Sequence, residues 1–113
     1  MALQSVAESS AQGQVFAALA DRTRRLLIDR LASGGPATAT QLAGGLPISR
    51  QAVAKHLVQL QGAGLIRPDR PGRRARYDLR PGQLSDARRW LREIEDAWDR
   101  RLEALTRYVE DSG

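Results

Sequence analysis

A polar and basic stretch in the middle of this 113-residue chain carries the side chains best suited to chemistry. It begins at Ser49 and continues with Arg50, Gln51 and Lys55, while the apolar residues between them recur at helical spacing. In the DNA major groove, Arg can donate in a fork to guanine and Gln can pair with adenine. The pattern therefore predicts a recognition helix over residues 49–62, with one buried face and one face of hydrogen-bond donors.

Within this helix, several roles stay open. Ser49 is first a helix cap, because its oxygen can accept from a free amide of the first turn, and phosphate contact is its second role. Arg50 suits a base edge and a phosphate equally well, and Lys55 is expected to contact a base or the DNA backbone. His56 lies beside the apolar stripe, so its first role is a hydrogen-bonded boundary residue; DNA contact comes second and metal ligation third.

An arginine-rich hairpin follows this helix directly. Residues 65–79 predict two antiparallel strands, because alternating residues flank a Pro-Gly turn. Arg73 and Arg74 fall at the tip, where they can enter a minor groove or pair with phosphates, ordinary solvated charge being the alternative. Arg76, together with Arg67, is expected to add phosphate contacts. A basic hairpin beside a donor-bearing helix suits DNA.

Positive charge is concentrated in the same region. The whole chain carries a net charge of +5, but residues 50–80 hold eight basic and two acidic residues, which gives 8 − 2 = +6. Residues 84–113 hold eight acidic residues and six arginines, which gives 6 − 8 = −2. A basic field of this kind attracts polyanions, of which nucleic acid is the commonest.

The remaining elements place the polar helix and the hairpin within a recognisable order. Apolar periodicity and capping residues predict helices at about 14–20, 23–32 and 40–44, ahead of the helix over 49–62. A short helix, a tight turn and a Ser-capped longer helix follow helix-turn-helix spacing. With the hairpin added, the expected fold is mainly α: a winged helix-turn-helix of five helices with a two-stranded antiparallel wing.

A long amphipathic helix is predicted over about residues 83–110. It would be about 40 Å long, which is more than so small a domain can cover with itself. A second copy of the chain is the favoured cover, and a monomer with a folded-back helix is the alternative. The residues expected at the dimer contact, from the first and last helices, are Val15, Phe16, Leu91, Ile94, Trp98, Leu102 and Leu105.

The composition argues against metal and enzyme chemistry. The chain has no cysteine and a single histidine, which leaves little room for a thiolate or transition-metal site. No Ser-His-Asp set with a plausible pocket, phosphate-cradling glycine loop or metal cluster is visible in the sequence. We therefore expect neither an enzyme nor a bound cofactor.

The chain termini bear on domain organisation and location. Residues 1–11 are small and polar without periodicity, so they are expected to form a disordered tail ahead of one domain over 12–113. The N-terminus lacks the basic start and apolar stretch of a secretion signal, and no run reaches the ~20 apolar residues that cross a bilayer. These features predict a cytoplasmic protein without membrane contact.

With these features, the chain resembles the ArsR/SmtB family of bacterial winged-helix repressors. The resemblance rests on residues 15–31, 49–66 and 72–79, and residues 90–105 resemble a metal-independent branch of that family. It implies a homodimer built from the first and last helices that binds an inverted-repeat operator in double-stranded DNA. It also implies repression by blocking polymerase and release of DNA when an effector binds.

The sequence departs from the family pattern at two places. Ala52 and Ala54 stand where hydroxyl residues are frequent, which shifts the expected base contacts to Arg50, Gln51 and Lys55. The cysteines and histidines of the metal-sensing members are missing from the third and last helices, so metal sensing is not expected. The effector and the operator sequence are not readable. The alternative function is a winged-helix module for protein–protein contact without sequence-specific DNA binding.

Overall fold

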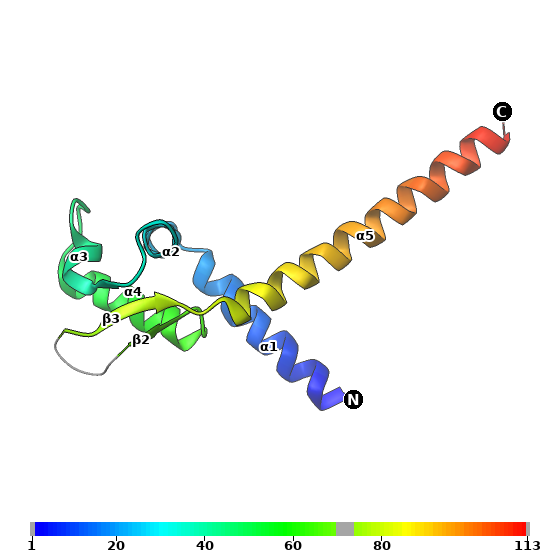
Figure 1. Ribbon diagram of the computed structural model, residues 1–113. Coiled ribbons are helices and arrows are strands. Elements are labelled where there is room, and N and C mark those ends of the chain that lie inside the picture. The colour runs from blue at the N-terminus through cyan, green and yellow to red at the C-terminus, as the bar shows by residue number, and fades with distance from the viewer. Residues whose placement is uncertain (1, 70–73, 113) are drawn as a thin grey trace.

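Five helices and three short strands make up residues 2–69 and 74–112, the part of the chain described by this computed structural model. In order, the elements are α1 (Ala2–Leu19), α2 (Arg22–Gly34), β1 (Ala37–Thr38), α3 (Ala39–Ala43), α4 (Arg50–Gly62), β2 (Ile66–Pro68), β3 (Arg76–Leu79) and α5 (Pro81–Ser112). Helices α2, α3 and α4 gather with the sheet at one end, and α5 projects away from them (Figure 1). The expected mainly helical fold is confirmed.

Aliphatic side chains from α1 to β2 build the core. Most of these residues come from helices, as expected for a chain with only 4% aromatic residues. The fully buried side chains are Val15, Leu27, Leu31, Leu42, Val53, Leu57, Leu60, Leu65 and Ile66. This core holds α4 firmly between α2, α3 and the sheet, so the orientation of its outward face is fixed by packing.

Side-chain caps define where the central helices begin. The Asp21 carboxylate accepts from the backbone N–H of Arg24 at 2.9 Å at the start of α2. Ser49 Oγ accepts from the backbone N–H of Ala52 at 3.1 Å at the start of α4. Each cap satisfies an amide that the helix itself leaves without a partner. The predicted capping role of Ser49 is confirmed.

The Ser49 cap gives a first testable expectation. Ser49→Ala is expected to destabilise the protein by about 1 kcal/mol, because the Ala52 amide loses its acceptor. Ser49→Asp retains an acceptor and should keep stability near that of the unchanged protein. Urea unfolding measures both, with Ser33→Ala, an exposed serine inside α2, as the control. Equal stability of Ser49→Ala and the control would contradict the capping role.

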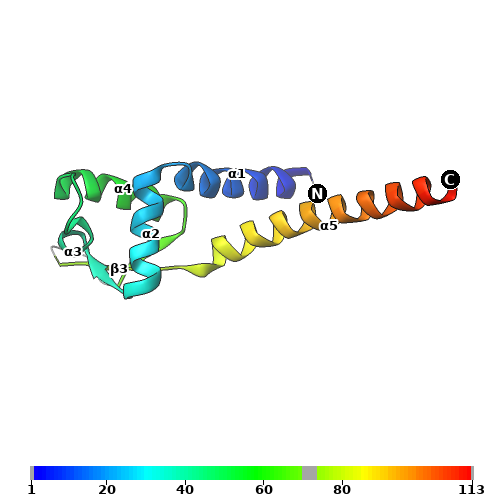
Figure 2. The same cartoon turned by 90° about the horizontal axis from the view of Figure 1, so that it is seen from above.

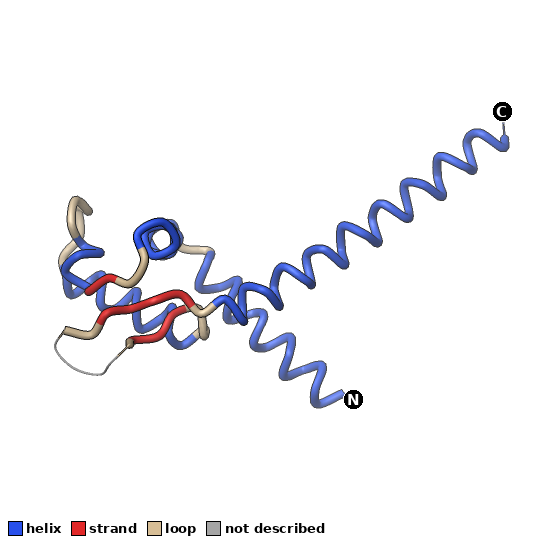
Figure 3. The backbone as a smooth tube through the Cα atoms, viewed as in Figure 1, coloured by secondary structure: helices blue, strands red, loops and turns tan. Residues whose placement is uncertain are grey.

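The wing is a three-stranded antiparallel sheet, whereas the sequence predicted two strands. The strand order is β1-β3-β2, with Ala37 opposite Tyr77 and Ile66 opposite Leu79 (Figure 3). The predicted hairpin of β2 and β3 is present, and β1 adds to the free edge of β3. A strand of only two residues, Ala37–Thr38, shows no alternation from which a sequence could predict it.

Helix α1 begins at Ala2, within the segment that was expected to be a disordered N-terminal tail. Residues 2–11 include three Ala with one Leu, one Gln and one Glu, which favour a helix by intrinsic propensity. Leu3 and Val6 are the only large apolar residues among them, so no extended apolar stripe marks this stretch as helical. The expectation of a disordered segment is therefore not met over 2–11, and the domain boundary at residue 12 stays a prediction.

Helix α5 runs for 32 residues, or about 48 Å, slightly beyond the predicted 83–110. Ala87 is its single buried residue. Seen from above, α1 and α5 extend from the same side of the winged domain, and α5 continues past the start of α1 (Figure 2). Within the described residues, no helix combines the length and apolar character needed to span a bilayer.

Candidate DNA-binding surface

Helix α4 divides into a buried face and a polar face, as predicted. Val53, Leu57 and Leu60 are at most 1% exposed. Arg50, Gln51 and Lys55 are exposed on the outside of the helix. The side chains that can donate to bases are therefore free of the core.

A groove of about 690 Å³ lies beside the first turns of α4. It is bordered by α3, by α4 and by the returning strand of the wing. Its lining residues are Thr38, Ala39, Thr40, Arg50, Gln51, Ala54, Arg74, Ala75 and Tyr77. Two guanidinium groups and several hydroxyl groups thus border one concave surface. Such groups are the usual donors to phosphate oxygens, which fix a protein on a duplex.

Three hydroxyl-bearing groove residues were not expected at the site: Thr38, Thr40 and Tyr77. The Thr38 hydroxyl is used locally, because it accepts from the Gln41 backbone N–H at 3.1 Å and caps α3. Thr40 is exposed in α3. The sequence signal for these two residues was a pair of threonines at the start of the short helix.

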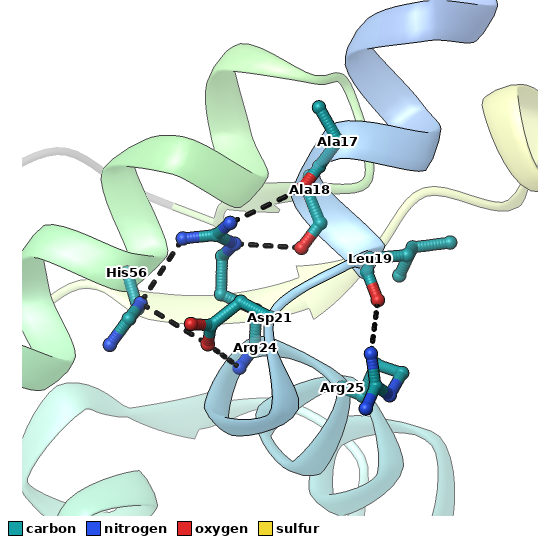
Figure 4. A network of polar contacts seen from close by, with 7 residues as sticks. All are labelled: Ala17, Ala18, Leu19, Asp21, Arg24, Arg25 and His56. Atoms are coloured by element: carbon teal, nitrogen blue, oxygen red, sulfur yellow. Dashed lines mark hydrogen bonds and ion pairs between the residues drawn. The ribbon is translucent and has the colours of Figure 1, made fainter.

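His56 is not among the residues that line this groove, so the groove gives no support to the DNA contact that was its second expected role. It is about 140° around α4 from Gln51, and its side chain is only 25% exposed. Its Nδ1 lies 3.4 Å from Arg24 Nη1 and 3.8 Å from Asp21 Oδ2 (Figure 4). The physical reason is the helical turn, which points position 56 at the start of α2. His56 is the hydrogen-bonded boundary residue that was its first expected role.

Asp21 is held in its charged form at this junction. The hydrogen bond from the Arg24 amide is the main cause that lowers the pKa of the Asp21 carboxyl below its ordinary value of 3.8. The charge of Arg24, and that of His56 when its ring is protonated, acts in the same direction. The carboxylate stabilises the fold fully at pH above the pKa of Asp21 in the unfolded chain. This stabilisation is lost as the pH falls through the lower pKa that Asp21 has in the folded protein.

Two of the predicted wing arginines, Arg74 and Arg76, have different surroundings. Arg74 is exposed and lines the groove, which agrees with a role in phosphate contact. Arg76 instead pairs with Asp69: its Nε and Nη2 each lie 3.0 Å from Asp69 Oδ2. The Arg76 side chain is still 53% exposed beside this ion pair, so the expected phosphate contact by Arg76 stays a prediction. Arg73 lies outside the described residues.

The predicted dimer contacts on α5 are all exposed in the single chain. The exposed fractions run from 43% to 55% for Leu91, Ile94, Trp98, Leu102 and Leu105. They leave a continuous apolar face on the projecting helix.

The two predicted dimer contacts on α1 differ from each other. Phe16 is half-buried and its ring packs 5.5 Å from that of Trp90 on α5. Val15 is 0% exposed, so its assignment to the dimer contact is corrected. At this position the apolar face of α1 packs into the core of the same protomer.

Potential metal ligands are scattered over the described residues. In residues 2–69 and 74–112, no three His, Asp or Glu side chains converge as a metal site would require.

Comparison with known proteins finds relatives among transcriptional regulators. The helix-turn-helix domain family matches residues 19–69. The chain is 39% identical to the HTH-type transcriptional regulator Rv2034 of Mycobacterium tuberculosis, over 88% of this chain and 90% of that protein. It is 36% identical to the transcriptional repressor SdpR of Bacillus subtilis, over 68% of this chain and 84% of that protein.

A solved structure agrees with these relatives. The ArsR-like transcriptional regulator from Rhodococcus sp. RHA1 superposes with a TM-score of 0.75 at 40% identity, covering 88% of this chain and 92% of that one. The fold of this chain is thus that of a known group of regulators. The chain belongs to the ArsR family of winged helix-turn-helix transcriptional regulators.

Proposed function

We propose that this protein is a homodimeric repressor of the cytoplasm that binds an inverted-repeat operator in duplex DNA. Helix α4 enters the major groove with Arg50 and Gln51 towards base edges, and Arg74 holds a flanking phosphate. The observation that carries this proposal is the shared groove, in which the first turns of α4 and the wing border one concave, donor-rich surface.

The dimer is proposed from the exposed apolar face of α5. Its spacing is symmetrical about Trp98: Ile94 and Leu102 lie four residues to either side, and Leu91 and Leu105 lie seven residues to either side. Two antiparallel copies related by a two-fold axis near Trp98 would bring apolar side chains together along the helix. Covering such a face removes a large apolar area from water, which favours association.

Repression without a metal effector is proposed from the donor chemistry. The sequence holds no thiol, and the ring of its single histidine faces Arg24 and Asp21. A cationic guanidinium beside His56 Nδ1 disfavours a metal ion there. A dimer seated on an operator would block polymerase, in keeping with the name of SdpR as a repressor.

A gel-shift assay tests the proposed function. The full chain is incubated at low salt with duplex DNA from upstream of its own gene and with a shuffled duplex of the same composition. Retardation of the upstream duplex at protein concentrations that leave the shuffled one free supports an operator-binding regulator. Equal retardation of both, or of neither, would contradict sequence-specific binding.

Salt dependence gives a quantitative expectation. If the dimer neutralises ~6 phosphates, a plot of the logarithm of the binding constant against the logarithm of the salt concentration should have a slope of about −5. Fluorescence anisotropy with a labelled operator between about 50 and 200 mM salt measures the slope. The Arg74→Ala variant should make the slope smaller in magnitude, because it removes one phosphate contact per protomer. A slope near zero for the unchanged protein would contradict the electrostatic role of the groove.

A further inference from the structure

A single guanidinium group, that of Arg24, contacts two other helices where α1, α2 and α4 meet (Figure 4). Arg24 lies in the first turn of α2. Its Nε donates to the Ala18 carbonyl at 2.7 Å, and its Nη2 donates to the Ala17 carbonyl at 3.2 Å. Its Nη1 lies 3.4 Å from Nδ1 of His56 on α4. One side chain of α2 therefore joins α1 to the recognition helix.

On the α1 side, Arg24 occupies the end of the helix. The last carbonyl groups of a helix lack partners within it and form the negative end of its dipole. The planar guanidinium offers five donors in a fixed fork, which suits two neighbouring carbonyl oxygens such as those of Ala17 and Ala18. Arg24 thus fixes where α1 ends against α2.

On the α4 side, the contact depends on the imidazole of His56. Its Nδ1 accepts from Arg24 when that nitrogen carries no proton. Asp21 Oδ2 lies 3.8 Å from the same nitrogen and also accepts from the Arg24 backbone N–H at 2.9 Å. These three residues form a polar junction between the start of α2 and the middle of α4.

Polar contacts add direction to a packing that apolar contacts alone define loosely. Val15, Leu57 and Leu60 hold α1 and α4 to the core, but hydrophobic attraction has no preferred angle. Hydrogen bonds weaken steeply when their angles are poor. The junction at Arg24 therefore restrains how α4 is rotated relative to α1. Helix α1 is in turn packed on α5 through Phe16 and Trp90.

We infer that Arg24 is a positioning residue that sets the orientation of α4 relative to the α1–α5 pair, and through it the half-site separation that the dimer accepts. This inference rests on the proposed two-half-site function. Arg24 is not among the residues that line the groove beside α4, so it acts on DNA only through His56 and α1. Its loss should change which spacing is preferred more than it changes affinity for DNA in general.

The test compares Arg24→Met with Arg25→Met in the full-length protein. Arg25 is the matched control. Its Nη1 donates to the Leu19 carbonyl of α1 at 2.7 Å, and within the described residues this is the hydrogen bond of its side chain, so it reaches α1 but not α4. Affinities are measured for duplexes whose two half-sites are moved apart in single base-pair steps. Arg24→Met is expected to reduce the preference for the best spacing over its neighbours by about 2- to 30-fold, while Arg25→Met keeps the original profile.

His56→Leu is the second variant, since it removes only the acceptor on α4 and should shift the spacing profile in the same direction. It decides the question if Arg24→Met fails to fold. Unchanged profiles, or a loss of affinity by one common factor at all spacings, in the folded variants would overturn the positioning role. An unchanged protein that ignores spacing altogether would contradict the proposed function, and with it this inference.

Discussion

Replacing both Arg50 and Gln51 by Ala is expected to remove most of the preference for operator over non-specific DNA. Both side chains are exposed in the first turn of α4 and line the groove shared with the wing. A bidentate side-chain–base contact contributes ~1–3 kcal/mol of discrimination, so the pair should lower the ratio of specific to non-specific binding constants by about 30- to 20,000-fold per half-site. Anisotropy titrations with operator and shuffled duplexes measure that ratio.

The matched control for this variant is Gln61→Ala, near the other end of α4. Gln61 is also exposed, so the substitution tests the general effect of removing a polar side chain from the helix surface. It should leave the ratio unchanged. The single variant Gln51→Ala changes no charge, so its effect separates base recognition from loss of a phosphate contact. Retention of full preference by the double variant would contradict base recognition by the first turn of α4.

Replacing Trp98 by Glu is expected to convert the dimer to monomers and to weaken operator binding. Trp98 is 55% exposed at the centre of the apolar face of α5. A carboxylate there would be buried beside its own symmetry mate, which is strongly unfavourable. Loss of the linked second site typically lowers affinity by about 10²- to 10⁴-fold. Analytical ultracentrifugation gives the oligomeric state and anisotropy gives the affinity.

Arg107→Gln is the control for Trp98→Glu. It makes the same change of net charge, and it lies on the side of α5 opposite the apolar face. This variant should remain dimeric and bind the operator as the unchanged protein does. Circular dichroism establishes that both variants are folded. A dimeric Trp98→Glu variant with full affinity would place the subunit contact elsewhere.

Local signals were sufficient to predict helices α4 and α5. The cap at Ser49, the stripe of Val53, Leu57 and Leu60 and the glycine-rich end define α4 from neighbouring residues alone. The apolar repeat of α5 is long enough to predict a helix without knowledge of its partner. In both cases the periodicity extends over several turns, so packing and sequence agree.

The partners of single side chains could not be predicted in the same way. His56 meets Arg24, 32 positions earlier in the chain, and only the packing of α2 against α4 brings them together. Arg76 forms an ion pair with Asp69 across the hairpin, which depends on the register of the two strands. Val15 shows that an apolar period identifies a buried face but does not tell whether the same chain or another covers it.

Selection of bound sequences from a random duplex library tests most directly whether two α4 helices recognise DNA together. We predict an enriched inverted repeat whose half-site centres are separated by about 10–10.5 base pairs or a multiple of that distance. The bound complex should contain two protein chains per duplex. Enrichment of a single unrepeated site occupied by one chain, or no enrichment at all, would contradict it.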